Sequence, residues 1–423
     1  MSSKVKLADL TLKIGSGSTP KGGKAAYLDS GIFKLIRSQN VYNHHFSKDG
    51  LAYISETQAQ KLQNVELKKN DILINITGDS VARTTIVTDE MLPGRVNQHV
   101  SIIRCNEEKL NPYFLLAILT SNDMQRYLLS LAQVGGTRAA LTKGMLENLE
   151  IDLLNKNQQE FVHQILSSVN SKIKVNQRII KLLEEISQTL FKRWFIDFEF
   201  LNEQGLPYKS SGGKMMDSNL GEIPKDWRIS KVGNECKIIR GASPRPIQEF
   251  MASEGRPWVK ISDANASISC FIQGTKEFII EAGIKKSRTV EPGTLILSNS
   301  ATPGIPKFMD VLASVHDGWL IFNEYQSVSK EFMYLYLLHE REAILSMSNG
   351  SVFRNLKTDI LKNYKLVVPC EEVLNTFQKL VEPIFEQIRT LSDEIIKLSD
   401  IRNTLLPKLL SGEIEIPDES VVD

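Results

Sequence analysis

The stretch Gln158–Phe195 occurs twice in the chain, and this repetition constrains the fold more than any other feature of the sequence. A shift of 215 positions places it on Val373–Leu410, and the alignment runs without a gap from Leu141 on Leu356 to Phe195 on Leu410. The identical pairs are Ile173 and Ile388, Ile180 and Ile395, Leu183 and Leu398, Ile186 and Ile401, Thr189 and Thr404, and Leu190 and Leu405. We therefore expect one structural unit to be present twice.

Both copies carry the pattern of a long amphipathic helix. Apolar residues recur at steps of three, four or about seven, and charged residues flank them, as in a coiled coil. The two stripes are Ile165, Val169, Ile173, Ile180, Leu183 and Leu190, and Leu380, Ile384, Ile388, Leu391, Ile395, Leu398 and Leu405. Pro383 predicts a kink or a first helical turn. About forty helical residues reach roughly 60 Å, so we expect the two copies to form an antiparallel rod rather than parts of two ordinary cores.

Length and composition set broad limits. A chain of 423 residues exceeds what one core usually organises, so two or more domains are expected. No run of eighteen apolar residues occurs and the first residues lack the apolar core of a signal peptide, so we expect a cytoplasmic protein without a membrane segment. The formal net charge of +1 neither indicates nor excludes nucleic-acid binding. The four scattered cysteines favour buried thiols over a metal site or disulfides.

Turn and strand signals divide the chain into successive segments. Short strands are predicted at Phe33–Ile36, Asp71–Ile76 and Val100–Arg104, followed by one helix over Tyr113–Leu131 that Asn111 caps. We expect a globular domain at 1–154, a helical spacer at 155–200, a linker at 201–220, a second globular domain at 221–370, a second helical spacer at 371–416, and a tail at 417–423.

The second globular segment retraces the first. The matched blocks are Gly17–Pro20 with Gly241–Pro246, Gly31–Gln39 with Gly255–Asp263, Asn70–Ile74 with Gly293–Leu297, and Phe114–Thr120 with Phe332–Leu338. These blocks predict an α+β protein in which two similar globular α/β domains are separated by two long antiparallel coiled-coil helices, related by a pseudo-two-fold internal repeat. Two inverted modules at a fixed distance suit a polymer with two-fold character, and duplex DNA, with a turn of about 34 to 36 Å, is the obvious candidate.

Three motifs resemble a known family. GEIPKDW (Gly221–Trp227) opens the second half, LFKRWFIDF (Leu190–Phe198) closes the first helix, and RNTLLPKLLSGEIEI (Arg402–Ile416) closes the second. At these positions in a repeated chain they resemble the specificity subunit of type I restriction-modification systems, and the resemblance covers essentially the whole chain. It implies that each globular domain is a target recognition domain reading one half of a split double-stranded DNA sequence. The helices would set the spacing and dock two modification subunits.

The same resemblance implies where the chemistry belongs. The modification subunits would carry S-adenosylmethionine and methylate adenine, and separate restriction subunits would use ATP and Mg to translocate and cleave DNA. This chain would then be a non-catalytic subunit that binds no cofactor itself. The alternatives are a self-sufficient DNA methyltransferase or nuclease, and a coiled-coil scaffold that binds proteins only.

Sequence motifs give the enzyme alternative little support. Asn111–Phe114 reads N-P-Y-F, which is similar to an amino-methyltransferase signature but lacks its second proline and is explained by helix capping. Asp49 with Glu66 and Lys68 fits a nuclease pattern that is common by chance. The adjacent His44 and His45 are more typical of a surface or turn than of a metal site. We predict no catalytic and no metal-binding residue.

Loop residues with the chemistry of base and phosphate contacts are the candidates for DNA binding. Arginine and lysine bind guanine, asparagine and glutamine bind adenine, and other basic groups hold phosphates. The candidates in the first domain are Lys21, Lys24, Arg37, Gln39, Asn40, Arg83, Asn97, Gln98 and Arg138. Those in the second are Arg240, Arg245, Lys260, Asp263, Asn299, Lys307 and Arg354. For partner binding we name Trp194, Phe195 and Phe198, with the alternative that these rings pack the helix pair against a domain.

Overall fold

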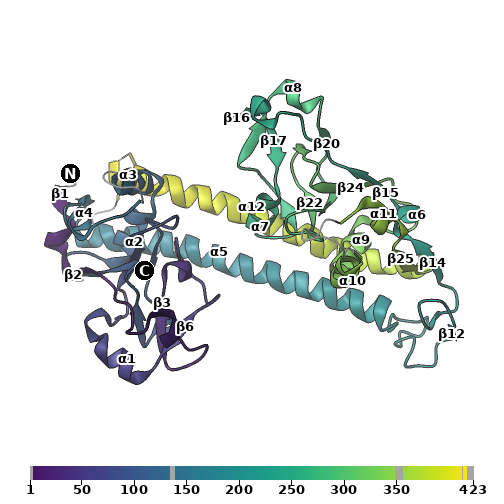
Figure 1. The fold of residues 1–423 in the computed structure, drawn as a ribbon, viewed down its shortest axis with the longest axis horizontal. Coiled ribbons are helices and arrows are strands. Elements are labelled where there is room, and N and C mark those ends of the chain that lie inside the picture. Colours follow the sequence, from purple (N-terminus) through teal and green to yellow (C-terminus); the bar gives the residue numbers. More distant parts are fainter. Residues whose placement is uncertain (1–2, 134–138, 348–355, 412, 417–423) are drawn as a thin grey trace. The chain divides into compact units, whose positions relative to one another are not determined.

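The computed structural model describes residues 3–133, 139–347, 356–411 and 413–416. The chain, of mixed helix and strand content (Figure 1), divides into two compact units. Unit 1 is formed by residues 1–172 with residues 397–423, and unit 2 by residues 173–396. Two long helices, α5 (Lys156–Phe191) and α12 (Glu371–Ser411), contribute residues to both units.

Unit 1 begins with short strands and helices. Its strands are β1 (Ser3–Lys6), β2 (Thr11–Ser16), β3 (Phe33–Ile36), β4 (Val41–Tyr42), β5 (His45–Phe46), β6 (Ala52–Ile54), β7 (Ile72–Asn75), β8 (Thr84–Ile86), β9 (Gly94–Val96), β10 (Val100–Cys105) and β11 (Glu150–Leu153). Its shorter helices are α1 (Glu56–Lys61), α2 (Pro112–Thr120), α3 (Asn122–Gln133) and α4 (Lys143–Glu147). The three strands predicted from the sequence are confirmed, each to within one residue at either end.

The sheet β2-β10-β7-β8 of unit 1 is buried on both faces. Successive strand residues point to opposite faces, so Ile72 and Ile74 join the core beneath α2 whereas Leu73 joins the core beneath β3. This is why β7 reads as an uninterrupted apolar run. β3 itself lies in a second sheet, β6-β3-β9, in which Ile36 pairs in parallel with Val96. That pairing brings the end of β3 beside the turn between β9 and β10.

Helix capping follows the sequence, but the helix after Asn111 is shorter than predicted. The Asn111 side chain accepts hydrogen bonds from the backbone N–H groups of Tyr113 (2.8 Å) and Phe114 (3.2 Å), which confirms capping as the role of this motif. The single helix Tyr113–Leu131 is wrong, because α2 and α3 break at Ser121, whose backbone is extended. Its hydroxyl donates to the Ile118 carbonyl and accepts from the Met124 N–H, so it ends one helix and caps the next.

The described residues of unit 2 contain two five-stranded sheets and two shorter strand pairs. Its strands are β12 (Met215–Met216), β13 (Ile223–Pro224), β14 (Arg228–Lys231), β15 (Lys237–Arg240), β16 (Met251–Ala252), β17 (Arg256–Val259), β18 (Phe271–Ile272), β19 (Glu277–Ile279), β20 (Arg288–Val290), β21 (Leu295–Ser298), β22 (Pro306–Met309), β23 (Ala313–Val315), β24 (Trp319–Asn323) and β25 (Lys365–Val368). Its shorter helices are α6 (Val232–Glu235), α7 (Ile261–Ala266), α8 (Glu281–Ile284), α9 (Lys330–His339), α10 (Arg341–Ser346) and α11 (Thr358–Asn363).

The two five-stranded sheets of unit 2 are β15-β24-β21-β22-β18 and β16-β19-β17-β23-β20. They are joined at Trp319 of β24, which is fully buried and donates its indole N–H to the Val259 carbonyl of β17 at 3.1 Å. Val259 pairs in parallel with Val315. Figure 1 shows β17 and α8 projecting away from the long helices within this unit.

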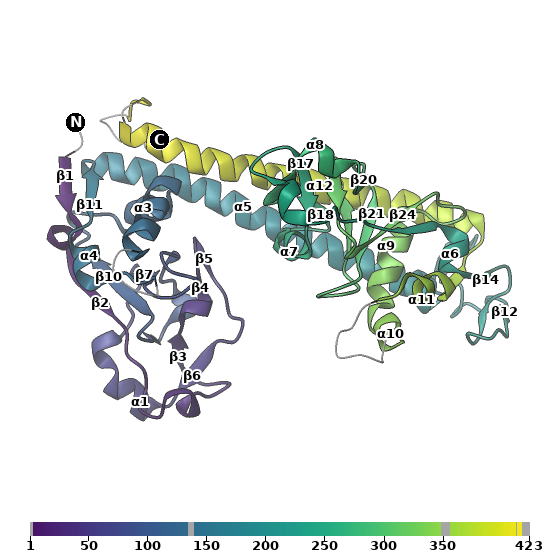
Figure 2. The same cartoon turned by 45° about the horizontal axis from the view of Figure 1, so that its top comes forward.

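Within unit 2, α5 and α12 run antiparallel, because Asn176 donates to Glu394 (2.8 Å) and the Phe191 ring lies 6.3 Å from the Phe377 ring. Figures 1 and 2 both show the two helices side by side. Residues of both predicted stripes are buried here, among them Ile180, Ile388 and Ile395. Leu380 was predicted to lie in the seam and is instead 45% exposed. Pro383 lies well inside α12 and does not begin it.

Unit 1 holds the other ends of the same helices. Arg402 of α12 donates to the Asn170 side chain of α5 at 3.2 Å, and Leu406 and Leu409 join the core cluster that contains Val162 and Leu166. Across the described parts of the chain, no helix combines the length and the apolar character needed to cross a membrane.

The segment expected to be a linker has internal contacts. Leu201 pairs with Pro207, β12 pairs with β13, and the Phe200 ring stacks on Tyr208 at 4.5 Å and on Trp227 at 5.1 Å. The segment after α5 is therefore anchored by aromatic packing within unit 2.

Candidate nucleic-acid interface

Each unit carries a loop that begins at a glycine and lies against the turn before the next long strand. In unit 1 the N–H of Gly17 donates to the Val100 carbonyl (2.8 Å), and that of Ser18 to the Val96 carbonyl (3.0 Å). A Cβ atom on Gly17 would lie 2.2 Å from the Asn97 carbonyl oxygen, so only glycine allows this approach. The close approach fixes the loop beside the turn Asn97–Gln98.

The loop of unit 2 is held in the same way. The N–H of Gly241 donates to the Trp319 carbonyl (2.9 Å), and that of Ala242 to the Val315 carbonyl (3.2 Å). A Cβ on Gly241 would lie 2.1 Å from the His316 carbonyl oxygen. The residue four positions after the glycine is Lys21 in unit 1 and Arg245 in unit 2, and both side chains are exposed.

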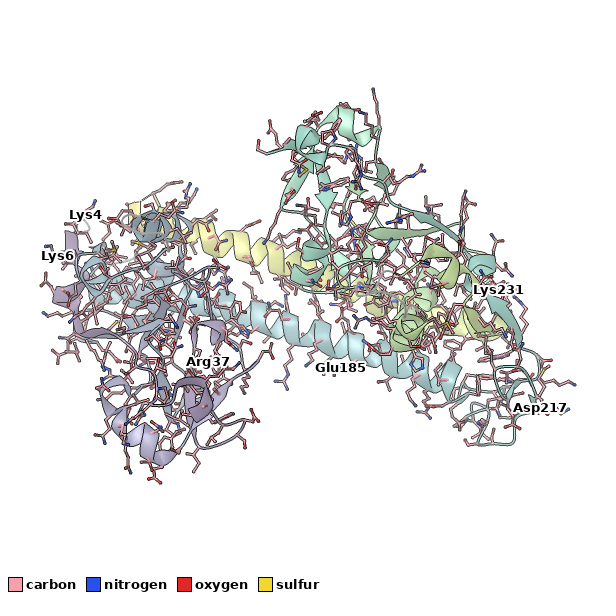
Figure 3. All side chains as sticks on the ribbon, viewed as in Figure 1. Lys4, Lys6, Arg37, Glu185, Asp217 and Lys231 are labelled. Atoms are coloured by element: carbon pink, nitrogen blue, oxygen red, sulfur yellow. The ribbon has the colours of Figure 1, made fainter. Side chains whose placement is uncertain are left out.

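Three predicted residues of unit 1 converge on one turn. The Arg37 guanidinium donates to the Gly50 carbonyl and lies 5.2 Å from the Tyr27 ring, and the Gln39 amide lies 3.5 Å from the Asp49 carbonyl. The Asn40 side chain is fully buried, where it accepts from the Arg37 N–H (3.1 Å) and donates to the Ser47 carbonyl (3.0 Å). Arg37 is labelled in Figure 3 and, with Gln39, leaves polar atoms at the surface, whereas Asn40 shapes the turn.

The other candidates of unit 1 are more dispersed. Lys21 and Lys24 are exposed, and Arg83 lies over the Tyr42 ring at 4.7 Å. Asn97 is buried and accepts from the His99 N–H (3.2 Å), while the neighbouring Gln98 is exposed and contacts the His99 ring at 3.1 Å. Predicted residue Arg138 lies outside the described residues.

In unit 2, three of the predicted residues contact Asp317, a residue that the sequence reasoning missed. Arg240 Nε donates to the Asp317 carbonyl (2.7 Å), and Asn299 Nδ2 donates to the same oxygen (3.1 Å). The Asp317 carboxylate accepts from the Ser243 hydroxyl (2.6 Å) and lies 3.7 Å from Arg240 and 3.6 Å from Arg245. Asn299 is buried, so it contacts Asp317 from the interior of the domain.

The Asp317 carboxylate is stabilised in its charged form. The hydrogen bond from Ser243 is the main cause that holds its pKa below the usual value, and the nearby Arg240 contributes. Neighbouring His316 is largely buried, which lowers its pKa, and its Nδ1 accepts from the Gly318 N–H at 2.8 Å. The carboxylate is therefore the fixed negative charge between two arginines.

A cleft of about 750 Å³ opens beside this cluster. Arg245, Lys260, Trp258 and His316 contribute to its lining. Lys260 forms an ion pair with Glu277, and its backbone N–H donates to the Asp263 carboxylate (2.8 Å) at the start of α7. Asp263 is buried and has a capping role.

The cap at Asp263 also corrects the alignment of the two halves. Asn40 caps η3 (Ser38–Asn40) by accepting from the N–H three residues earlier, as Asp263 does for α7. Asp263 thus corresponds to Asn40, and the sequence match that placed it on Gln39 is wrong by one residue. The match followed the identical pairs Gly31 with Gly255 and Ser38 with Ser262, which do not occupy equivalent positions.

Two candidates remain in unit 2. Lys307 lies away from the Asp317 cluster: its ammonium group donates to the Ser269 carbonyl (2.6 Å), and burial lowers its pKa. It lies near Glu184 of α5, whose pKa is raised by burial. Glu185, the next residue, is exposed at the helix surface (Figure 3). Predicted residue Arg354 lies outside the described residues.

The aromatic residues proposed for partner binding lie at the end of α5. Trp194 and Phe195 are each only 5% exposed, in the π-helical turn η6 (Lys192–Ile196), and both pack against Phe377, at 5.6 and 4.6 Å. This packing favours the alternative in which the rings fasten the helix pair to the domain. Phe198 is partly exposed and lies 5.5 Å from the Trp227 ring.

The sequence of this chain is similar to those of known proteins. A profile of the type I restriction modification DNA specificity domain matches residues 2–185 and, a second time, residues 224–404. The chain belongs to this family of specificity domains. The specificity subunit of the type I restriction enzyme HindI from Haemophilus influenzae is 23% identical over 90% of this chain and 94% of that protein. The MjaIX specificity subunit from Methanocaldococcus jannaschii is 26% identical over 72% of this chain and 69% of that protein.

A solved structure shows a similar fold. The type I restriction-modification S subunit from M. genitalium matches with a TM-score of 0.56 and 16% identity, covering 99% of this chain and 96% of that one. In this specificity-domain chain the candidates Arg240, Arg245 and Asn299 are brought together by their contacts to Asp317. The sequence signal that could have pointed to Asp317 is the Asp-Gly pair just before β24, a dipeptide that is typical of turns.

Proposed function

We propose that this chain is the non-catalytic DNA-recognition subunit of a type I restriction-modification complex, in which each unit reads one half of a bipartite target. The observation that carries the proposal is the double match of one DNA specificity profile to a single chain. S-adenosylmethionine, ATP and Mg belong, in this proposal, to the partner subunits. The surface loops at Lys21 and Arg245 are the parts that approach DNA.

Internal duplication of the chain is part of the proposal. The 215-residue shift that aligns the repeated stretch also relates the starts of α5 and α12 (Lys156 and Glu371) and the bounds of β11 and β25. β11 pairs antiparallel with β1, as β25 does with β14. Shared topology supports a common origin of the two units, which differ in their loops.

The helices act, in this proposal, as a spacer between the two recognition domains. α5 has 36 residues and α12 has 41, which corresponds to roughly 54 and 62 Å of helix. One turn of DNA is about 34 to 36 Å, so rigid helices of this length suit two half-sites on one face of the duplex. An antiparallel pair would also give the two domains the inverted orientation that duplex symmetry favours.

Modification subunits dock, we propose, on the outward face of the helices. α5 exposes four apolar side chains on one face, Val175, Ile179, Leu182 and Ile186, which are between 37% and 52% exposed. Their spacing of four, three and four residues forms a stripe that an apolar helix face of a partner could cover. The same shift of 215 places Thr390, Glu394, Lys397 and Ile401 on α12, so the two partner subunits would meet different surfaces.

The docking proposal is tested by the double substitution Ile179→Glu and Leu182→Glu. Two buried charges in an apolar interface are costly, so we expect the complex to lose the modification subunit that contacts α5. The matched control is Gln188→Glu, which adds one carboxylate at an exposed position on the same helix. Light scattering of the co-expressed complex measures the stoichiometry. Two bound subunits in both variants would refute docking on the stripe.

The recognition function is tested by mapping methylated adenines across the genome of a host with and without the gene for this chain. We expect methylation at a motif of two defined segments separated by a fixed number of unspecified bases. Methylation that does not depend on the gene, or a motif with one continuous segment, would contradict the proposal.

A further inference from the structure

Asp317 accepts more hydrogen bonds than its small contribution to the stability of the fold explains. Arg240 and Arg245 side chains are 59% and 80% exposed, and both ion pairs to Asp317 exceed 3.5 Å. Exposed pairs of this kind contribute little to stability. The Asp317 carbonyl and carboxylate nevertheless accept hydrogen bonds from Arg240, Asn299 and Ser243. These hydrogen bonds indicate that Asp317 positions its neighbours.

The position of the cluster suggests what it orients. Arg245 lines the cleft of about 750 Å³ together with Lys260 and Ser262. One terminal nitrogen of Arg245 faces Asp317 at 3.6 Å, and none of the hydrogen bonds found among the described residues engages its other guanidinium nitrogens. A guanidinium with two free N–H groups in one plane matches the O6 and N7 acceptors of guanine.

The charges of Asp317 and the two arginines also favour a positioning role for Asp317. Without a carboxylate, two neighbouring guanidinium groups would repel each other and spread over many conformations. The ionised Asp317, whose pKa is lowered chiefly by the Ser243 hydrogen bond, offsets that repulsion. Asp317 thus keeps Arg245 near one orientation before DNA arrives, and less conformational entropy is lost on binding.

Unit 1 lacks this device at the corresponding positions. Gln98 occupies the position of Asp317 and turns towards the His99 ring, and Thr19 occupies the position of Ser243. The Thr19 hydroxyl is buried and has no hydrogen-bond partner among the described residues. Lys21, in the place of Arg245, is a single flexible charge that cannot make a planar bidentate contact.

We propose that Asp317 is a positioning residue that holds Arg245 over the cleft as a guanine-binding group, so that the half-site read by unit 2 requires a guanine at the base that Arg245 contacts, whereas Lys21 imposes no such requirement at the corresponding base of the unit 1 half-site. This inference rests on the proposed function, since it assumes that unit 2 reads DNA.

The test is selection of bound sequences from a randomised DNA library by the complex of the full chain with its modification subunits. The variants are Asp317→Asn and, as a matched control, Glu324→Gln, which removes an exposed carboxylate that pairs with Lys237 in the same unit. We expect Asp317→Asn to reduce the preference for guanine at one position of one half-site by roughly tenfold. The other half-site should be unchanged, and the loss of a negative charge should not weaken non-specific binding. The control should select like the unaltered chain.

Several outcomes would overturn the inference. They are an unaltered guanine preference in Asp317→Asn, an equal loss in both half-sites, or a unit 2 half-site without guanine. Failure of the unaltered complex to select any bipartite sequence would instead refute the proposed function. If Asp317→Asn melts well below the control, Ser243→Ala takes its place, because it removes only the hydroxyl that orients the carboxylate. A full guanine preference in a folded Ser243→Ala chain would then count against the positioning role.

Discussion

The loops at Gly17 and Gly241 have the same backbone contacts and different side chains. Each glycine N–H donates to the first residue of the following strand, Val100 or Trp319, and each approaches the carbonyl of the turn residue Asn97 or His316. Unit 2 then presents Ser243, Arg245 and Asp317 where unit 1 presents Thr19, Lys21 and Gln98. The difference indicates that the frame positions a loop, while three side chains determine its electrostatics. Two units of one chain can therefore recognise unlike half-sites.

The largest effect should come from Arg245→Ala. A bidentate contact between arginine and guanine discriminates by about 1 to 3 kcal/mol, so we expect roughly a 5- to 150-fold loss of preference at one base of the unit 2 half-site. Lys231→Ala is the control, because Lys231 lies on β14, away from the cleft lining, and is labelled in Figure 3. Competition binding with single-base variants of the target measures the loss. An equal loss at both half-sites would contradict the assignment of Arg245 to the unit 2 half-site.

Arg37→Ala and Gln39→Ala should give the reciprocal result in unit 1. Both side chains extend from the segment Arg37–Gln39 to the Gly50 carbonyl, and Arg37 also lies against the Tyr27 ring. We expect weaker or relaxed recognition of the other half-site only, by about 1 kcal/mol or more for each contact that reads a base. The same competition assay applies. Unchanged recognition, or a loss shared by both half-sites, would remove these residues from the interface.

The smallest expected effect is a gain of base preference in the unit 1 half-site. The double substitution Lys21→Arg and Gln98→Asp introduces into unit 1 the arginine and carboxylate that unit 2 has as Arg245 and Asp317. The Thr19 hydroxyl can then donate to the new carboxylate. We expect a new preference for guanine in the unit 1 half-site of only a few-fold, because the rest of the loop is not adapted to it. Sequence selection measures this change. The single substitution Lys21→Arg serves as the control, and an equal gain in both variants would show that the carboxylate adds nothing.

Features that depend on neighbours in the sequence were predictable. The Asn111 cap, the apolar run at Ile72–Ile74 and both long helices follow from local patterns. The break at Ser121 was missed because apolar residues recur on both sides of the polar stretch Thr120–Asp123, and serine is tolerated in a helix as well as at its end. Leu380 fits the helical stripe by spacing, yet packing leaves it exposed.

The Asp317 cluster could not be predicted in the same way. Ser243 and Asp317 are 74 residues apart in the sequence, and only the pairing of β15 and β24 brings them together. Selection of candidates by residue type favours cations and amides, and it therefore left out the Asp317 carboxylate. Lys307 has the right chemistry for phosphate binding, but its ammonium group is bonded to a backbone carbonyl in a largely buried position.

The central claim is that each unit reads its own half of one bipartite target. The most direct measurement is parallel sequence selection with complexes that contain the unaltered chain, Arg37→Ala or Arg245→Ala. We predict two defined segments for the unaltered chain, loss of information in one segment for Arg37→Ala, and loss in the other segment for Arg245→Ala. Degradation of the same segment by both substitutions would contradict the account.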